Sequence, residues 1–332
     1  MIVVVKEYGA VTRKKGNCLL IKGNEEREIC ADQVKELHVY SACNLSADVI
    51  AFCMEKDIWV IFVDKYGNPL GELLPFSGGC SPIYKRNQLI LADSPIGIEI
   101  AKGFLIQKIE NRISHLKHIL HNKRSKKIIV QLKMSVQKMN EEVEKIRNTC
   151  GKTMSEVRES LQGYEGVAGR AYFESISMLL PEELRFFRRE RNANDVYNCI
   201  LNYLYGILYA KAKNIVYKCR LDPYIGIMHV DSYNKPTFVY DFVESQRIIC
   251  EELAFHLCSS GIIGSNSVFL EENRLRFTEE AKQIIISEFY AIMNEQCYFK
   301  KKSMTGERKM YLEMLEVAKK IGRMNEDVLA IV

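Results

Sequence analysis

The 332-residue sequence lacks any apolar run long enough to cross a membrane. A membrane-spanning helix needs about 18 or more predominantly apolar residues, and every stretch of that length here is interrupted by polar side chains. The amino terminus offers only four apolar residues, Ile2 to Val5, before Lys6, fewer than the apolar segment of a signal peptide. We therefore expect a cytoplasmic protein that has no membrane partner.

The eleven cysteines form no recognisable metal or disulfide pattern. Their number is odd, and no Cys-x-x-Cys pair occurs between Cys18 and Cys297. A zinc ribbon needs such pairs, and a disulfide framework of a small secreted protein uses an even number. We therefore expect most of the cysteines to be small core residues in a reducing compartment.

Several fingerprints of common enzyme classes are also missing. The sequence has no GxGxxG, no GxxxxGK[ST] and no GxSxG motif, so it lacks support as a dinucleotide-binding enzyme, a P-loop NTPase or a serine hydrolase. Glycine and proline are scarce, at 19 and 7 residues, whereas 47% of the residues are apolar. This composition excludes a disordered or collagen-like chain and predicts a packed globular protein of about two domains.

Positive charge is concentrated locally, although the net charge is only +5. Residues 108–147 carry eleven lysines and arginines against four glutamates, and a second cluster comprises Arg185, Arg188, Arg189 and Arg191. Guanidinium and ammonium groups in such clusters suit phosphate groups of a nucleic acid. A solvated helix face has the same pattern, so charge alone leaves both interpretations open.

The periodicity of apolar residues predicts an α+β protein with two domains. Residues 1–85 are expected to form a small antiparallel β domain and linker, and residues 86–332 a larger, mainly α-helical domain. In the first domain we expect strands at 2–5, 18–21, 37–40 and 58–63, with one helix at 46–56. In the second we expect helices near 96–121, 123–148, 152–160, 165–180, 194–218, 241–259 and 278–296, and an extended pair or hairpin at 221–229 and 235–240.

Glu165 is the first candidate site residue. We expect it to open the helix at 165–173, where Ala168, Gly169 and Tyr172 share its face and indicate that this face is buried. A buried carboxylate needs a compensating metal ion, arginine or proton. The alternative is a glutamate in the first turn of a helix, favoured there by the helix dipole.

His229, Asp241 and Glu244 form the second group of candidates. His229 ends an apolar stretch, and Asp241 and Glu244 stand three residues apart at an expected helix start, so both carboxylates are within reach of one cation. The same Asp-x-x-Glu spacing is also that of a capping box, with Asp241 as the N-cap. A structural role for His229 likewise remains open.

Three further histidines, His115, His118 and His121, do not make a convincing metal site. Each step of three residues falls about 60° short of a full helical turn. The three histidine side chains therefore spread around an α-helix. We therefore exclude them as joint ligands.

Three segments in this order resemble the CRISPR-associated spacer integrases, the first of the two universal adaptation proteins of CRISPR systems. They are 163–173 (Gly-Tyr-Glu-Gly-Val-Ala-Gly-Arg-Ala-Tyr-Phe), 221–229 (Leu-Asp-Pro-Tyr-Ile-Gly-Ile-Met-His) and 238–244 (Phe-Val-Tyr-Asp-Phe-Val-Glu). The turn at 9–16 and the run at 58–67 fit the amino-terminal sheet of that family. The resemblance therefore covers the chain.

The resemblance implies a homodimeric, metal-dependent DNA endonuclease and integrase. Matched residue by residue, Glu165, His229 and Glu244 fall on the family's metal ligands, and Asp241 falls on an additional acid beside them. Two carboxylates and an imidazole suit Mg²⁺ or Mn²⁺. The chain departs from the family at 191–196, where Arg-Asn-Ala-Asn-Asp-Val replaces a proline-rich run that ends in Asp-Pro.

The resemblance also implies partners. These are a protospacer DNA fragment, the CRISPR repeat that its 3′-OH attacks, and a small second adaptation protein. Basic side chains would hold the phosphate backbone without reading its sequence: Arg185, Arg188, Arg189, Lys123, Arg124, Lys126 and Lys127.

Two other functions fit the residues. One is a metal-dependent nuclease that works outside CRISPR adaptation. The other is a non-catalytic DNA-binding scaffold, in which Glu165 is part of a buried ion pair and the carboxylates of Asp241 and Glu244 only cap a helix. Metal-dependent joining of DNA distinguishes the integrase from both.

Overall fold

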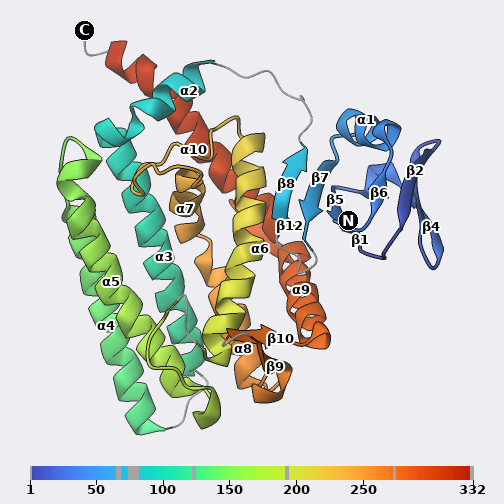
Figure 1. Cartoon of the computed structure of the whole chain (residues 1–332). Coiled ribbons are helices and arrows are strands. Elements are labelled where there is room, and N and C mark those ends of the chain that lie inside the picture. The colour runs from blue at the N-terminus through green and yellow to red at the C-terminus, as the bar shows by residue number, and fades with distance from the viewer. Residues whose placement is uncertain are drawn as a thin grey trace. The chain divides into compact units, whose positions relative to one another are not determined.

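The computed structural model describes residues 2–64, 69–73, 82–121, 125–190, 194–271 and 274–329. The chain divides into two compact units, Met1–Cys80 and Ser81–Val332, the first built on strands and the second on helices (Figure 1). The α+β class expected from the sequence is confirmed. The division falls a few residues before residue 85, because α2 (Pro82–Leu89) joins the helical unit through a hydrogen bond of 2.6 Å from Asn87 Nδ2 to the Ile321 carbonyl.

The first unit contains two four-stranded sheets. One has the order β1-β5-β7-β8 and the other the order β4-β3-β2-β6. The strands are β1 (Ile2–Val5), β2 (Val11–Lys15), β3 (Cys18–Lys22), β4 (Glu26–Cys30), β5 (Glu36–Tyr40), β6 (Asn44–Leu45), β7 (Trp59–Val63) and β8 (Pro69–Leu73), with η1 (Ala31–Gln33) between β4 and β5.

Strand pairing in these sheets is mixed rather than purely antiparallel. The antiparallel prediction holds for β2–β3, β3–β4 and β7–β8, but it is wrong for β1–β5, β5–β7 and β2–β6, which are parallel. Parallel neighbours need a crossover connection, and helix α1 (Ala47–Glu55) supplies it between β5 and β7. Val39 of β5 and Val60 of β7 are buried in the core of this unit.

The second unit is built on long helices. Its elements are η2 (Leu91–Asp93), α3 (Pro95–His121), α4 (Lys126–Asn148), α5 (Met154–Leu179), η3 (Glu182–Leu184), α6 (Val196–Lys218), α7 (Thr237–Glu244), α8 (Arg247–Ser259), η4 (Ser265–Ser267), α9 (Glu279–Asn294) and α10 (Gly306–Leu329). Two hairpins accompany them, β9 (Val268–Glu271) with β10 (Arg274–Phe277), and β11 (Gln296–Phe299) with β12 (Lys302–Thr305).

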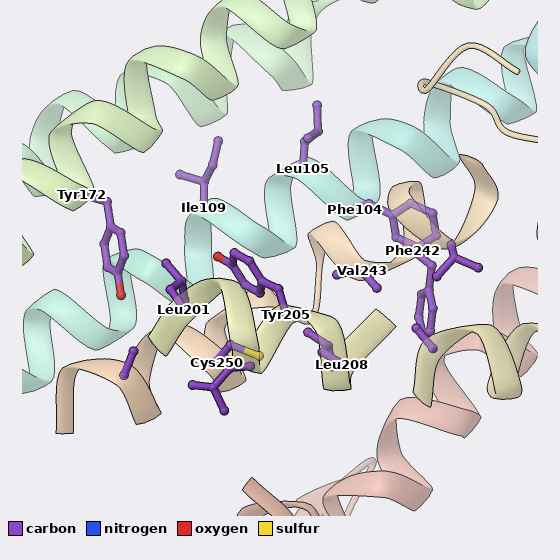
Figure 2. Packing of buried hydrophobic residues seen from close by; sticks show 14 of the residues in the cluster. Phe104, Leu105, Ile109, Tyr172, Leu201, Tyr205, Leu208, Phe242, Val243 and Cys250 are labelled. Atoms are coloured by element: carbon purple, nitrogen blue, oxygen red, sulfur yellow. The ribbon is translucent and has the colours of Figure 1, made fainter. Parts of the chain in front are cut away.

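Helix α3 runs through the core of this unit. Leu105 and Ile109 on α3 belong to one buried cluster with side chains from α5, α6, α7 and α8, among them Tyr172, Leu201 and Phe242 (Figure 2). Each large apolar side chain buried in this way contributes about 1.5–3 kcal/mol. A polar side chain on a buried face of α3 therefore also lies in the core.

Three predictions for this unit are wrong. Helix α5 is continuous where two helices were expected, so Glu165 lies inside it and does not open a helix. The expected hairpin is absent from the described residues 221–240, and the segment from Thr237 is helical. The helix expected at 241–259 is divided into α7 and α8 at Ser245 and Gln246.

The cysteines and the helices of the described residues bear on the expectations of a reducing compartment and of no membrane span. All ten cysteines among them are free, and four are buried, namely Cys53, Cys219, Cys250 and Cys258. Within the same residues, none of the helices combines the length and apolar character that crossing a membrane requires.

The close approach of α3 to η2 predicts opposite effects for two glycine substitutions on one helix. A Cβ on Gly97 would lie 1.9 Å from the Leu91 carbonyl oxygen, whereas a Cβ on Gly103 meets nothing within 4 Å. We expect Gly97→Ala to lower the free energy of unfolding by about 1–3 kcal/mol. Gly103→Ala should raise it by about 0.5–1 kcal/mol. Urea unfolding of both variants checks this, and equal effects would contradict the close approach.

Candidate active site

Glu165 faces α3 from the middle of α5. Its Oε1 accepts a hydrogen bond of 2.5 Å from Lys108 Nζ and lies 3.6 Å from Arg112 Nη1. The side chain of Glu165 is 27% exposed, whereas that of Lys108 is 6% exposed. Glu165 is therefore the part of this pair that remains in contact with solvent.

Glu244 is the last residue of α7, and its carboxylate is buried among cations. Its Oε2 accepts a hydrogen bond of 2.5 Å from Lys108 Nζ. Arg247, in the first turn of α8, binds the same carboxylate through two hydrogen bonds, 2.9 Å from Nε to Oε2 and 2.8 Å from Nη2 to Oε1. Glu244 and Arg247 are three residues apart, a spacing at which side chains on one helical face can meet.

Lys108 therefore joins two of the three predicted ligands, which lie on different helices. The carboxylate oxygens of Glu165 and Glu244 both bond the same ammonium nitrogen, so they lie within twice the 2.5 Å bond length of each other. Sequence reasoning missed Lys108. Its position within the apolar stretch of α3, next to Ile109 and three residues after Leu105, was the available signal.

A second buried ion pair lies beside the first. Arg112, one turn after Lys108 on α3, donates from Nε and Nη2 to Glu251 of α8 at 2.9 and 2.6 Å. Tyr205 of α6 donates a further hydrogen bond of 2.8 Å to Glu251. The third nitrogen, Arg112 Nη1, has no hydrogen-bond partner among the described residues. Arg112, Arg247 and Glu251 also escaped the sequence analysis.

These cations keep the buried carboxyl groups ionised. Burial by itself favours the neutral acid, but the charges of Lys108 and Arg112 outweigh it and lower the pKa of Glu165. Burial is likewise outweighed at Glu244, whose pKa is lowered by Arg247 and Lys108. The site therefore offers two carboxylates in the charged form that binds metal ions.

His229 is oriented by Asp241. The ring nitrogen Nδ1 lies 2.7 Å from Asp241 Oδ1, and the ring of His229 contacts that of Tyr240 with a centroid distance of 5.8 Å. A histidine that donates one ring N–H to a carboxylate presents its other nitrogen as a metal ligand, and this arrangement is common in metal sites. The side chain of His229 is 32% exposed.

Asp241 holds the loop that carries His229. Its carboxylate accepts hydrogen bonds from three successive backbone N–H groups, those of Ile227 at 2.6 Å, Met228 at 3.1 Å and His229 at 3.0 Å. The capping-box alternative is wrong, because Asp241 lies inside α7 and Pro236 precedes the helix. A carboxylate 1% exposed that binds a loop is thus a structural element of the site.

No contact between His229 and the two glutamates is found in the described part of the chain. The link from His229 to Glu244 is indirect and passes through two tyrosines. The Tyr240 ring contacts the Tyr209 ring at a centroid distance of 5.5 Å, and the Tyr209 hydroxyl accepts a hydrogen bond of 3.1 Å from Arg247. Among the described residues, no three histidine, cysteine, aspartate or glutamate side chains are arranged to hold a metal ion. The shared site of Glu165, His229 and Glu244 therefore stays a prediction.

The donor set nevertheless fits a divalent cation. Glu165 and Glu244 carry hard carboxylate oxygens that both bond one ammonium group, and His229 carries an imidazole held by Asp241. Such a set suits Mg²⁺ or Mn²⁺. The ammonium of Lys108 lies where the two glutamates converge.

The basic side chains differ in exposure. Arg185 and Arg188 are exposed, whereas Arg189 donates to Asn198 Oδ1 at 2.8 Å and Asn202 Oδ1 at 2.6 Å and stabilises its own loop. Lys126 and Lys127 are exposed at the start of α4 and line a groove between α4 and α5. Lys123 and Arg124 lie outside the described residues, as do the first three positions of the segment 191–196.

One histidine of the excluded trio is a core residue. His115 Nδ1 lies 2.8 Å from the Tyr172 hydroxyl, in a buried contact between α3 and α5. Burial lowers the pKa of His115 to about 4, so the ring is neutral at physiological pH.

Comparisons with known proteins show which family and which fold this chain resembles. A CRISPR-associated endonuclease Cas1 from Archaeoglobus fulgidus is 29% identical over 261 residues, which is 74% of each chain. Among solved structures, a casposase bound to its integration product has a TM-score of 0.76 at 22% identity, covering 97% of this chain and 90% of that one. A Cas6-RT-Cas1–Cas2 complex has a TM-score of 0.75 at 21% identity, covering 97% of this chain and 35% of that one.

The family comparison spans both units of the structure. The model of the family "CRISPR associated protein Cas1" matches residues 3–291, a range that includes Glu165, His229, Asp241 and Glu244. Because this match covers most of the sequence, the chain belongs to the Cas1 family.

Proposed function

We propose that this protein inserts fragments of foreign DNA as new spacers into a CRISPR array, by attack of a fragment's 3′-OH on a phosphodiester of the repeat. As a member of the Cas1 family, it is a CRISPR-associated nuclease and integrase. The observation that carries the proposal is the convergence of Glu165 and Glu244, from different helices, on one positive group.

Glu165, His229 and Glu244 would hold Mg²⁺ or Mn²⁺. When bound, such an ion polarises the scissile phosphodiester and stabilises negative charge on the attacking or leaving oxygen. Asp241 fixes the orientation of the imidazole. Arg247 fixes the Glu244 carboxylate through two hydrogen bonds, and Arg112 keeps positive charge near Glu165.

DNA and a second adaptation protein are the proposed partners. The exposed Arg185, Arg188, Lys126 and Lys127 would contact phosphate groups of the protospacer fragment and the repeat, as would Lys123 and Arg124. The casposase structure contains an integration product, and another relative is part of a complex with Cas2. By analogy, we propose a homodimer that binds a small Cas2-like protein in the cytoplasm.

The two rival functions make different demands on the same residues. The scaffold requires Glu165 in a buried ion pair, and such a pair is present with Lys108. The scaffold does not account for His229, whose Nδ1 is held by a buried aspartate while its side chain remains partly exposed. A general nuclease would use the same site residues as the integrase, so only the products of the reaction distinguish the two.

Replacing Glu244 tests catalysis directly. We expect Glu244→Gln to reduce Mn²⁺-dependent joining of a 3′-OH DNA fragment to a repeat duplex by about 100-fold or more, because it removes a charged ligand. DNA affinity should stay within a few-fold, since phosphate contacts elsewhere supply it. The measurement is a joining assay on labelled DNA, with the proposed Cas2-like partner present.

Glu142→Gln is the matched control. Glu142 is also buried and paired with a lysine, Lys145, but on α4 and outside the site. It should join DNA at nearly the wild-type rate. Joining retained in Glu244→Gln would exclude Glu244 as a ligand. Cutting without joining by the wild type, with its partner present, would favour the general nuclease.

Replacing Asp241 tests the orientation of His229. Asp241→Asn exchanges an acceptor oxygen for an NH₂ group that cannot accept the backbone N–H groups of the loop. We expect a loss of about 1–3 kcal/mol of unfolding free energy. We also expect Mn²⁺ affinity to fall about 10–100-fold, because the imidazole is no longer fixed.

Asp231→Asn separates these two effects. Asp231 Oδ1 accepts hydrogen bonds from Gly226 N at 2.7 Å and Thr237 Oγ1 at 2.9 Å, so it stabilises the same loop without a described contact to His229. We expect it to lose stability but to keep Mn²⁺ affinity within a few-fold. Chemical unfolding and calorimetric titration measure the two quantities. If both variants lose Mn²⁺ affinity equally, the affinity depends on the order of the loop and not on the orientation of His229.

A further inference from the structure

We propose that Lys108 is an internal competitor of the divalent cation: its ammonium holds Glu165 and Glu244 together until a metal ion displaces it. This inference rests on the proposed function, because it takes the two glutamates to be metal ligands. It adds a positioning residue that sets how tightly and how selectively the site takes up its metal.

The geometry places the ammonium where a cation would bind. Lys108 Nζ is 2.5 Å from Glu165 Oε1 and 2.5 Å from Glu244 Oε2. Bonds between divalent cations and carboxylate oxygens are about 2.0–2.6 Å long. An ammonium and a metal ion cannot share this position, because their charges repel strongly at such distances. Metal binding to both oxygens therefore requires the ammonium to move.

The ammonium also explains how the carboxylates come to lie together without a metal ion. Two carboxylates at this separation repel each other when both are ionised. Lys108 provides the positive charge between them, so the two helices can pack with the ligands already in place. The site is then organised before the metal ion arrives, which lowers the cost of ordering it.

Arg112 and Arg247, the neighbouring cations that the structure describes, are each fixed by aromatic rings as well as by hydrogen bonds. Arg112 is fixed by two hydrogen bonds to Glu251 and by the rings of Tyr172 and Phe173, each 5.0 Å from its guanidinium carbon. Arg247 is fixed by two hydrogen bonds to Glu244 and by the Tyr205 ring at 4.7 Å.

The described hydrogen bonds of the Lys108 ammonium all go to the two glutamates. Its flexible four-carbon stem allows the ammonium to swing aside. The partly exposed Glu165 leaves the site open to solvent on one side. Arg112 Nη1, which has no hydrogen-bond partner among the described residues, lies 3.6 Å from Glu165 and keeps a positive charge beside that carboxylate after the lysine departs.

Competition of this kind weakens apparent metal affinity. The state ready for metal is the one in which Lys108 has left, and the apparent dissociation constant rises as that state becomes rarer. The site therefore discriminates against monovalent cations, which offer the carboxylates no more charge than the lysine already does. A divalent cation offers twice that charge and displaces it.

Calorimetric titration with Mn²⁺ alone tests the competition. We expect Lys108→Met to bind Mn²⁺ about tenfold or more tightly than the wild type, because no ammonium has to be displaced. Lys108→Arg, which keeps the positive charge, should bind no more tightly than the wild type. An Mn²⁺ dissociation constant unchanged or raised in Lys108→Met would overturn the proposal.

Lys102→Met is the matched control. Lys102 is another buried lysine of α3, and its Nζ donates to Glu99 at 2.8 Å and to the Thr149 carbonyl at 3.0 Å, away from the two glutamates. It should bind Mn²⁺ as the wild type does. A gain in affinity equal to that of Lys108→Met would make the effect one of overall charge and overturn the proposal.

A second measurement avoids the risk that Lys108→Met does not fold. Reductive methylation of the wild-type protein, read by mass spectrometry of peptides, reports how accessible each lysine amine is. We expect Mn²⁺ to accelerate methylation of Lys108 several-fold and to leave Lys102 unchanged. An equal rate for Lys108 with and without Mn²⁺ would overturn the proposal.

The two proposals fail in different ways. If Glu244→Gln binds Mn²⁺ as tightly as the wild type, the metal site is wrong and the proposed function falls with it. If Mn²⁺ binding depends on Glu244 but neither Lys108 measurement responds, the metal site stands and the competition alone is refuted.

Discussion

Burial of charge is the constraint on which the helical unit depends. Helix α3 carries Lys108 and Arg112 into the core, and three glutamates from α5, α7 and α8 meet them there, namely Glu165, Glu244 and Glu251. A buried charge without a partner costs several kcal/mol, so each of these residues requires the others. The packing of four helices is thereby tied to the geometry of the site. Any shift of α5 or α7 along α3 would leave an unpaired charge in the core.

The sequence indicated candidate acids and a candidate histidine, but it did not indicate which residues hold them. Glu165 stood out because a carboxylate on an apolar helix face needs compensation, and Glu244 because it stands three residues after Asp241. The resemblance to the integrase family placed both glutamates among the ligands. Lys108 did not stand out, because its partners lie 57 and 136 residues away along the chain. A pattern within one helix carries no information about such distant pairing. Asp241 was predicted at the site with an open role, and its bonds to the backbone of 227–229 became visible only with the loop in place.

The periodicity of apolar residues predicted the long helices, but it failed in segments whose secondary structure is set by tertiary contacts. The ranges of α3, α4, α6 and α9 follow directly from apolar spacing. The segment 237–244 is rich in aromatic and β-branched residues, which favour a strand, yet it is helical because Phe238, Val239 and Phe242 all find buried contacts. Two helices were expected at 152–160 and 165–180, but α5 is continuous through Gly163, since packing against α3 and α4 offsets the low helix propensity of glycine. The parallel pairing of β5 with β7 depends on the crossover through α1, which neither strand encodes by itself.

The central claim is that Glu165, His229 and Glu244 bind one divalent cation in a site that Lys108 occupies in its absence. Anomalous X-ray scattering from crystals grown with Mn²⁺ tests it most directly, because the signal locates the metal independently of its ligands. The account predicts one strong peak at about 2.0–2.6 Å from oxygens of both glutamates and from a ring nitrogen of His229, with the Lys108 ammonium moved away. A peak elsewhere, with Lys108 still bonded to both carboxylates, would contradict it.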